Sequence, residues 1–162
     1  MHDKLDSIDL QILQTLQKHG RTKRNELAEQ VKLSIPAVSE RLRKLEERGV
    51  IRGYHAVLDG RRVGYGLTAF IFLTCDSPSH YSKVIERASA HAEILECHAI
   101  TGEGSHLLKV KTHSTETLEK LLAQIQLWTG VVNTRTHVVL SSPKEDTVIS
   151  LKYLPTEGWK AS

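Results

Sequence analysis

The stretch SIPAVSERLRKLEER, residues 34–48, carries the signals of a complete helix with two unlike faces. Ser34 can act as the N-cap, because its hydroxyl can accept a hydrogen bond from a free backbone N–H of the first turn. Gly49 is a natural residue just beyond the last turn. The apolar residues recur at positions i, i+4 and i+7 and form one stripe: Val38, Leu42 and Leu45. We therefore expect a helix that packs one face on a core and leaves the other face free.

The free face of this helix is small near its start and basic further along. Its residues are Ala37, Ser39, Glu40, Arg41, Arg43, Lys44 and Arg48. A helix that enters a DNA major groove needs little bulk at its tip, then hydrogen-bonding groups, then cations beside the phosphates. Solvated surface helices also carry basic faces, so the rest of the chain must decide between the two interpretations.

The distribution of charge favours nucleic-acid binding. The chain has 162 residues and a formal net charge of +3. Residues 1–58 hold eleven Lys and Arg against eight Asp and Glu, whereas residues 59–162 hold eleven of each. All the excess positive charge lies in the first third, which indicates a small nucleic-acid-binding module joined to a neutral module with another task.

Several classes of protein are disfavoured by the sequence. No apolar run approaches the ~20 residues of a membrane span, and the first residues lack the apolar core of a signal peptide. Cys75 and Cys97 are isolated, and the nine histidines are scattered without ligand spacing. No GxSxG, dinucleotide-binding or HExxH motif is present. We expect a cytoplasmic protein that is not an enzyme, with no catalytic residue, metal, cofactor or membrane partner.

Two further helices are expected before residue 34. Asp6 can cap a helix that ends at His19, where Gly20 follows, and Thr22 can cap a helix over residues 23–31. So short a connection to the helix at 34–48 is typical of a helix-turn-helix, although a small structural bundle is the alternative. The following VIRGYHAVL, residues 50–58, is predicted to be an extended strand, either a wing or a linker.

The second module is predicted to be a ferredoxin-like β-α-β-β-α-β unit, which makes the chain an α+β protein. Strands are expected over residues 67–75, 94–100, 106–112 and 131–140. One helix is expected from Pro78 to Ala90, with Val84, Ile85 and Ala88 facing inward. The other begins after a Ser114 or Thr115 cap and stops at Gly130. A further strand is possible at 148–153.

This fold hosts unrelated functions, so the function must be inferred from a site. An RNA-recognition motif is disfavoured, because HLLKVKT at 106–112 has no aromatic residue. The loop TGEGS, residues 101–105, offers free backbone N–H groups and close approach for a small anion, although a plain hairpin turn has the same composition. The open face of the sheet is expected to pack against a second copy.

The chain resembles the Lrp/AsnC, or feast/famine, family of transcriptional regulators. The resemblance rests on LDSIDLQILQTLQKHGR, ELAEQVKLSIPAVSERLRKLEERGVI, RGYHAVLD, ITGEGSHLLKV and GVVNTRTHVVLS. It implies a winged helix-turn-helix domain over residues 1–52, a linker strand over 53–65, a ferredoxin-like effector and oligomerisation domain over 66–142, and a C-terminal tail over 143–162. It also implies homodimers, often four assembled into an octamer, that bind a free amino acid at a contact between dimers.

The motifs assign candidate residues to two sites. For the effector they are Gly102, Glu103, Gly104, Ser105 and His106, with Thr134 and Thr136 as neighbours from another strand or subunit. Many relatives have Asp where Ser105 stands, so the usual acidic contact for the ammonium is missing unless Glu103 supplies it. For DNA, the base-reading candidates at the helix tip are Pro36, Ala37, Ser39 and Glu40, and the phosphate candidates are Arg24, Arg43, Lys44 and Arg52. Ser34 is a further candidate DNA contact. Arg41 can instead pair with a neighbouring acid and be structural.

The sequence thus predicts a DNA-binding, nucleoid-associated regulator of transcription that responds to an apolar amino acid such as leucine or methionine. The alternative is an architectural DNA-wrapping protein without an effector, whose second domain only drives assembly.

Overall fold

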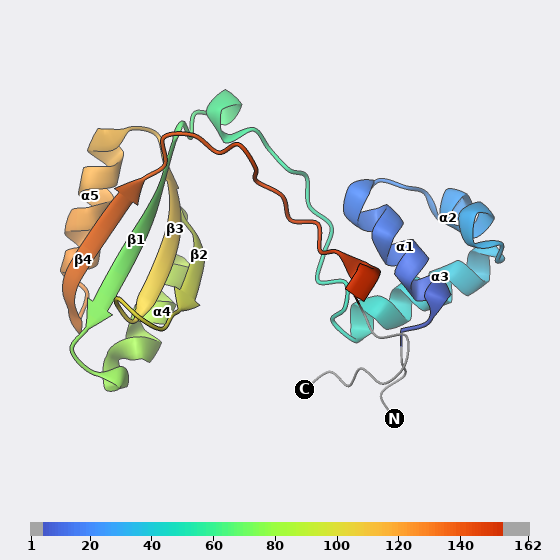
Figure 1. The fold of residues 1–162 in the computed structure, drawn as a ribbon, viewed down its shortest axis with the longest axis horizontal. Coiled ribbons are helices and arrows are strands. Elements are labelled where there is room, and N and C mark those ends of the chain that lie inside the picture. The colour runs from blue at the N-terminus through green and yellow to red at the C-terminus, as the bar shows by residue number, and fades with distance from the viewer. Residues whose placement is uncertain (1–4, 154–162) are drawn as a thin grey trace. The chain divides into compact units, whose positions relative to one another are not determined.

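The computed structural model describes residues 5–153, which divide into two compact units. One unit holds the residues up to Ala56 together with those from Glu145 onward, and the other holds Val57–Lys144. The first is helical and the second is built on a sheet, as Figure 1 shows, so the predicted α+β class is confirmed. No helix in the described range is long and apolar enough to cross a bilayer.

Three helices form the first unit: α1 at Ser7–Lys18, α2 at Arg24–Val31 and α3 at Ile35–Glu47. They enclose one apolar core, whose buried members are Ile12, Leu13, Leu27, Ala28, Val31, Val38, Leu42 and Leu45. The three stripe residues of α3 are all in this core, so its predicted two-faced character is confirmed.

The predicted caps of α1 and α3 are confirmed, and that of α2 is wrong. Ser34 Oγ accepts from the backbone N–H of Ala37 at 3.3 Å. The hydroxyl of Thr22 instead donates to the carbonyl of His19 at 2.7 Å. The N-cap of α2 is Lys23, whose backbone N–H donates to the Glu26 carboxylate at 3.1 Å. Thr22 is one residue before this N-cap, and its hydroxyl is not an acceptor for the first turn of α2.

The strand expected over residues 50–58, and the linker strand expected over 53–65, are wrong. This part of the described chain has no strand, only a 3₁₀ turn, η1, at Gly60–Val63. Val57 and Leu58 are 91% and 67% exposed. β-branched residues favour a strand only where a neighbouring strand can accept the backbone hydrogen bonds, and no neighbour within the described residues does so here.

The second unit is a four-stranded antiparallel sheet with the order β2-β3-β1-β4. Its strands are β1 at Leu67–Cys75, β2 at Ile94–Ala99, β3 at His106–Thr112 and β4 at Val131–Val138. Its helices are α4 at Tyr81–Ala90 and α5 at Thr115–Gln126. The predicted β-α-β-β-α-β order is confirmed.

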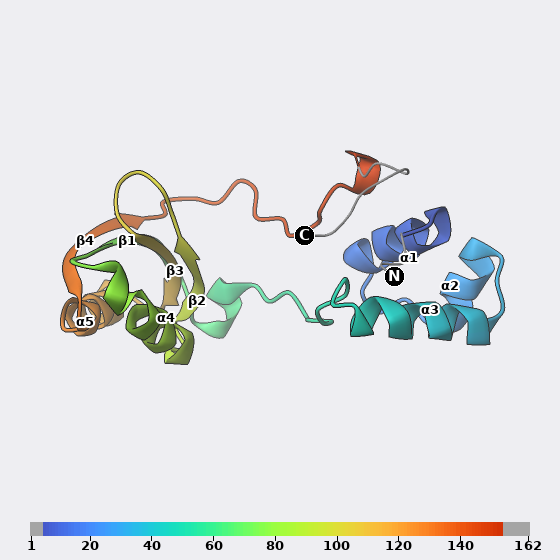
Figure 2. The same cartoon turned by 90° about the horizontal axis from the view of Figure 1, so that it is seen from below.

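Both helices cover the same face of this sheet, and the other face is open (Figure 2). The alternation of buried and half-buried residues in β1 and β3 follows from this one-sided cover. The buried residues of the layer between sheet and helices are Ala69, Ile71, Leu73, Val84, Ala88, Leu108, Val110, Leu118, Leu121, Ile125 and Trp128.

Four predicted details of this unit are wrong. Pro78–His80 forms a 3₁₀ turn, η2, before α4 begins, and Ile85 is 44% exposed rather than inward. The last helix ends at Gln126, ahead of Gly130, and β4 ends at Val138 instead of residue 140. The backbone N–H of His80 donates to the carbonyl of Ser77 three residues back, at 3.1 Å, which makes this first turn a 3₁₀ turn.

The segment after β4 does not form the further strand considered at 148–153. Its described part ends in a 3₁₀ turn, η3, at Leu151–Tyr153, which is grouped with the helical unit.

Candidate DNA-binding and ligand-binding sites

The candidate DNA-reading face lies on α3 and is accessible. Ala37 and Ser39 near the tip are half-buried, and the remaining candidates are exposed: Arg24, Ser34, Pro36, Glu40, Arg43, Lys44 and Arg52. The tip is therefore small and the basic residues stand further along, which is the distribution that a groove-reading helix needs.

Arg43 is held by two glutamates of its own helix. Its Nε and Nη2 donate to Glu40 at 2.9 and 2.7 Å, and its Nη1 donates to Glu47. The hydrogen bonds to Glu40 and Glu47 raise the pKa of Arg43, and its bond to Glu40 lowers the pKa of that carboxyl. A DNA phosphate could bind Arg43 only by displacing these carboxylates from the guanidinium. The two glutamates therefore weaken any attraction between Arg43 and the DNA backbone, whatever the sequence.

Arg41 pairs with acidic side chains of α1, in keeping with the structural role that the sequence offered for it as an alternative to DNA contact. Its Nη1 lies 2.7 Å from both Asp6 and Asp9, the two acids that begin α1. Burial alone would raise the pKa of Asp6, but the backbone N–H of Asp9 and the Arg41 guanidinium outweigh it and hold this pKa below its usual value. Arg41 thereby joins α3 to the N-terminus of α1.

Tyr54, just after α3, is a neighbour of the DNA face that the sequence patterns did not reveal. Its hydroxyl donates to Glu46 at 2.9 Å. Partial burial, together with this bond, raises the pKa of Tyr54 to about 12, against a smaller opposite effect of Arg24. The contact ties the chain leaving α3 back to its last turn, and no periodic signal marks such a pairing across a turn.

The loop at residues 101–105 depends on its glycines. Gly102 and Gly104 have φ angles of 94° and 97°, in the left-handed region that L residues rarely adopt. A Cβ on Gly104 would lie 2.7 Å from the carbonyl oxygen of Leu73. That same oxygen accepts from the backbone N–H of Ser105 at 2.7 Å and from its hydroxyl at 3.2 Å. The loop is thus pinned against the end of β1.

His106 lies directly behind this loop and is fully buried. Its Nδ1 is 3.1 Å from Ser105 Oγ, and its ring meets the Tyr81 ring edge-on at 4.8 Å. Because the Ser105 hydroxyl donates to Leu73, it can accept from Nδ1–H, which leaves Nε2 as an acceptor. Nε2 has no hydrogen-bond partner among the described residues, and burial lowers the pKa of the ring.

The predicted effector residues fall on two faces of the sheet. Leu73 in β1 pairs with His106 on one side and Thr134 on the other, so these three share the helix-covered face, and Thr136 follows two residues along β4. Thr134 Oγ1 also accepts from Gln126 in α5 at 3.2 Å. Glu103 instead pairs with Arg135 of β4, a residue between the two threonines that therefore faces the open side. Glu103 is thus already engaged by a cation.

The hollow beside the loop is small. Its volume is about 30 Å³, and it is lined by Phe72, Thr74, Glu103, Gly104, Asn133 and Arg135. Pockets for small molecules enclose about 300–1,000 Å³. A single copy of the chain therefore does not enclose an amino acid at this loop. Among the described residues, no group of three or more His, Cys, Asp or Glu side chains could hold a metal ion.

Comparison with known proteins agrees with both modules. Residues 5–52 match the family model described as winged helix-turn-helix DNA-binding, and residues 68–149 match the Lrp/AsnC ligand binding domain. The chain is 37% identical over 142 residues to the HTH-type transcriptional regulator LrpA of Mycobacterium tuberculosis, covering 88% of this chain and 94% of the relative. It is 35% identical over 151 residues to the leucine-responsive regulatory protein of Klebsiella pneumoniae, and the match covers 91% of this chain and 92% of the relative.

Solved structures show the same arrangement of modules within the chain. The transcriptional regulator NMB0573 of Neisseria meningitidis, in complex with L-Met, matches with a TM-score of 0.87 and 32% identity over 94% of this chain and 100% of that one. The feast or famine regulatory protein Rv3291c of M. tuberculosis, complexed with L-methionine, matches with a TM-score of 0.84 and 35% identity. The match covers 90% of this chain and 99% of that chain.

A helix-turn-helix followed by a ligand-binding domain of this type defines a DNA-binding regulator of transcription, not an enzyme. The chain belongs to the Lrp/AsnC family.

Proposed function

We propose that this regulator binds DNA as a homodimer or a larger assembly of dimers and responds to a free apolar amino acid of leucine or methionine size. The amino acid would lie at residues 102–106, at a contact between dimers. The two relatives solved with L-methionine support this class of effector. The observation that carries the proposal is the loop itself, in which two left-handed glycines fix the backbone beside a small open hollow.

The incomplete enclosure of the loop supports a site shared between subunits. About 30 Å³ is far less than an amino acid needs, so another chain must supply the remaining walls. The carboxylate of the effector would accept from loop N–H groups, and its ammonium would donate to backbone carbonyls of the loop. Glu103 is a poorer candidate for the ammonium, because Arg135 already pairs with it.

On DNA, we propose that two copies of α3 enter successive major grooves of a pseudo-palindromic site. The tip residues Ser34, Pro36, Ala37, Ser39 and Glu40 would meet base edges. Arg24, Arg43, Lys44 and Arg52 would meet phosphates. If the effector changes how dimers assemble, it also changes the spacing of these helices. It can shift the equilibrium between two assemblies only by the difference in its affinity for them.

The test is a thermal-shift screen of the full chain against the twenty amino acids, with light scattering for mass. Stabilisation by methionine, leucine or similar side chains, together with a changed mass, is the expected result. If no amino acid shifts the melting temperature of the folded oligomer at millimolar concentration, the effector proposal is wrong. The effector-free architectural function would then be favoured.

A further inference from the structure

The C-terminal segment beyond β4 is attached to the DNA-binding module by a reciprocal pair of hydrogen bonds. Nε2 of Gln17 in α1 donates to the carbonyl of Ile149 at 3.1 Å, and Oε1 of Gln17 accepts from the N–H of Ile149 at 2.7 Å. One carboxamide thus satisfies both backbone groups of a residue 132 positions away. A neighbouring strand would make the same pair of bonds, so the side chain replaces a strand edge here.

Two further contacts hold the segment. Leu151 packs against the apolar core of the three helices, although it lies at the far end of the sequence. Asp146 accepts from the backbone N–H of Val148 at 2.9 Å, which shapes the turn leading to Ile149. Hydrogen bonds from α1 therefore hold residue 149, and apolar packing on the three-helix core holds residue 151.

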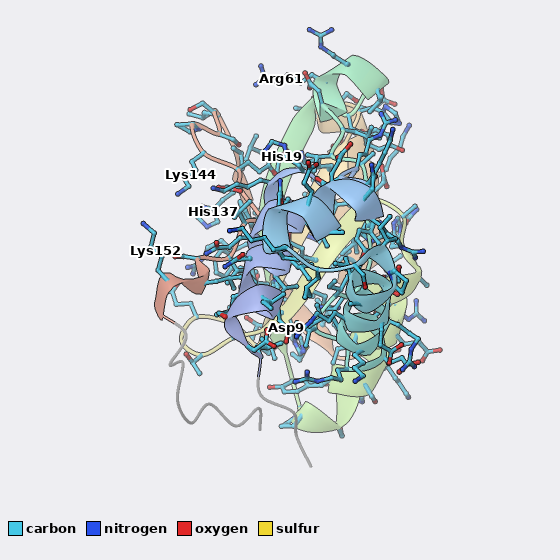
Figure 3. All side chains as sticks on the ribbon, turned by 90° about the vertical axis from the view of Figure 1, so that its right-hand side faces the viewer. Asp9, His19, Arg61, His137, Lys144 and Lys152 are labelled. Atoms are coloured by element: carbon cyan, nitrogen blue, oxygen red, sulfur yellow. The ribbon has the colours of Figure 1, made fainter. Side chains whose placement is uncertain are left out.

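The segment leaves the DNA-reading helix free. In Figure 3, η3 with Lys152 lies on one side of α1, while Asp9 and α3 lie on the other. Figure 2 shows the same order, with α1 between η3 and α3. Binding of DNA to α3 and docking of residues 146–151 on α1 are therefore compatible.

The chain order gives this contact a mechanical consequence. Residues 139–145 continue directly from β4, the strand whose Arg135 pairs with Glu103 of the ligand loop. The helical module is therefore joined to the ligand domain at two points, through the segment that leaves α3 and through the segment that ends on α1.

We propose that residues 146–151 form a strap that stabilises the DNA-binding module through α1 and transmits the state of the ligand domain to it. The second half of this proposal rests on the proposed effector function. Without the strap, the helical module would keep only the connection after α3, so a change at β4 would reach it through that connection alone.

The experiment compares Gln17→Ala and Leu151→Ser with Gln14→Ala, the same substitution at an exposed position of the same helix. Hydrogen exchange of the full chain should show α1 amides exchanging about five- to tenfold faster in the first two variants. Peptides from β1, β3 and α5 should be unchanged in all three. Methionine binding by calorimetry should persist, while the methionine-induced change in DNA affinity should shrink at least severalfold.

Unchanged α1 exchange in both Gln17→Ala and Leu151→Ser would overturn the strap. Loosened α1 with an undiminished methionine response would overturn its transmitting role. If methionine neither binds the unaltered protein nor changes its DNA affinity, the proposed effector fails. The exchange measurement still decides whether the strap docks.

Discussion

Nη1 of Arg41 in α3 lies 2.7 Å from Oδ1 of Asp9 in α1, and the Asp9 side chain is only 10% exposed. The same guanidinium nitrogen also contacts Asp6. The DNA-reading helix is therefore oriented against α1 by a charge-assisted contact as well as by the apolar core.

Arg41→Ala should destabilise the helical module, because it leaves the nearly buried Asp9 carboxylate without its cation. A loss of about 2 kcal/mol is expected, as is usual for hydrogen bonds to charged groups. Urea unfolding followed by a helix signal measures it, and Arg43→Ala, whose ion pairs are exposed, is the matched control and should lose much less stability. Equal losses in the two variants would contradict this role of Arg41.

Arg43→Ala should weaken binding to all DNA sequences alike. If Arg43 contacts one phosphate, its loss should flatten the slope of log K against log salt concentration by about one unit. Fluorescence anisotropy at several salt concentrations measures both effects. Lys120→Ala in α5 removes the same charge away from the candidate DNA face and is the control. An unchanged slope for Arg43→Ala would exclude the phosphate contact.

Glu47→Gln should have the opposite effect. It removes one of the two carboxylates that hold Arg43, so binding to DNA of any sequence should strengthen severalfold at low salt. The same anisotropy titration tests it. Weaker binding would show that Glu47 orients Arg43 for DNA and does not compete with it.

Gly104→Ala should damage the ligand loop more than Gly102→Ala. Both glycines have φ near 95°, so both substitutions carry similar backbone strain, of about 1–3 kcal/mol. Only at Gly104 would the new Cβ collide with the Leu73 carbonyl, at 2.7 Å, whereas nothing lies within 4 Å at Gly102. Thermal unfolding of the two variants measures the difference. Equal stability would mean that the loop does not need its contact with β1.

The ligand domain should lose stability as the pH falls below about 6.5, the usual pKa of histidine. Burial lowers the pKa of His106 in the folded chain, so the unfolded chain binds more protons between the two pKa values. The stability that depends on neutral His106 is therefore complete above the unfolded pKa and is lost as the pH falls through the folded one.

Unfolding at pH 7.5 and 5.5 measures this loss. His106→Gln should have a smaller pH dependence, whereas His137→Gln, at an exposed position of β4, should retain that of the unaltered protein. The same pH dependence in His106→Gln would assign the effect to another group.

Features that depend on neighbouring residues were predictable from the sequence. The helix at 35–47, its Ser34 cap and its buried stripe follow from short-range spacing, and so do the strands at 67–75 and 106–112. The errors are also local in origin. Thr22 and Lys23 are both close to the start of α2, and the helix begins at Arg24, which makes Lys23 the N-cap.

The candidate sites were predictable only in part. The glycines at 102 and 104 predicted a turn or a loop open to a small anion, and in the structure both have positive φ angles. A structural role for Arg41 was considered from the sequence, but the acids that hold Arg41 and Arg43 were not predictable, because several acids lie within reach of both. That Glu103 lies towards the open face of the sheet and His106 on the helix-covered face was likewise not predictable, because it depends on how the folded loop leaves the sheet.

Local patterns thus determined the two modules, their element order and the position of the ligand loop, because caps, turns and apolar periodicity act over a few residues. The packed chain determined that Arg41 joins α3 to α1, that Arg135 pairs with Glu103, and that Ile149 bonds to Gln17. Those contacts join residues 32 to 132 positions apart. Their formation depends on where the completed cores place each side chain, which no short window of sequence encodes.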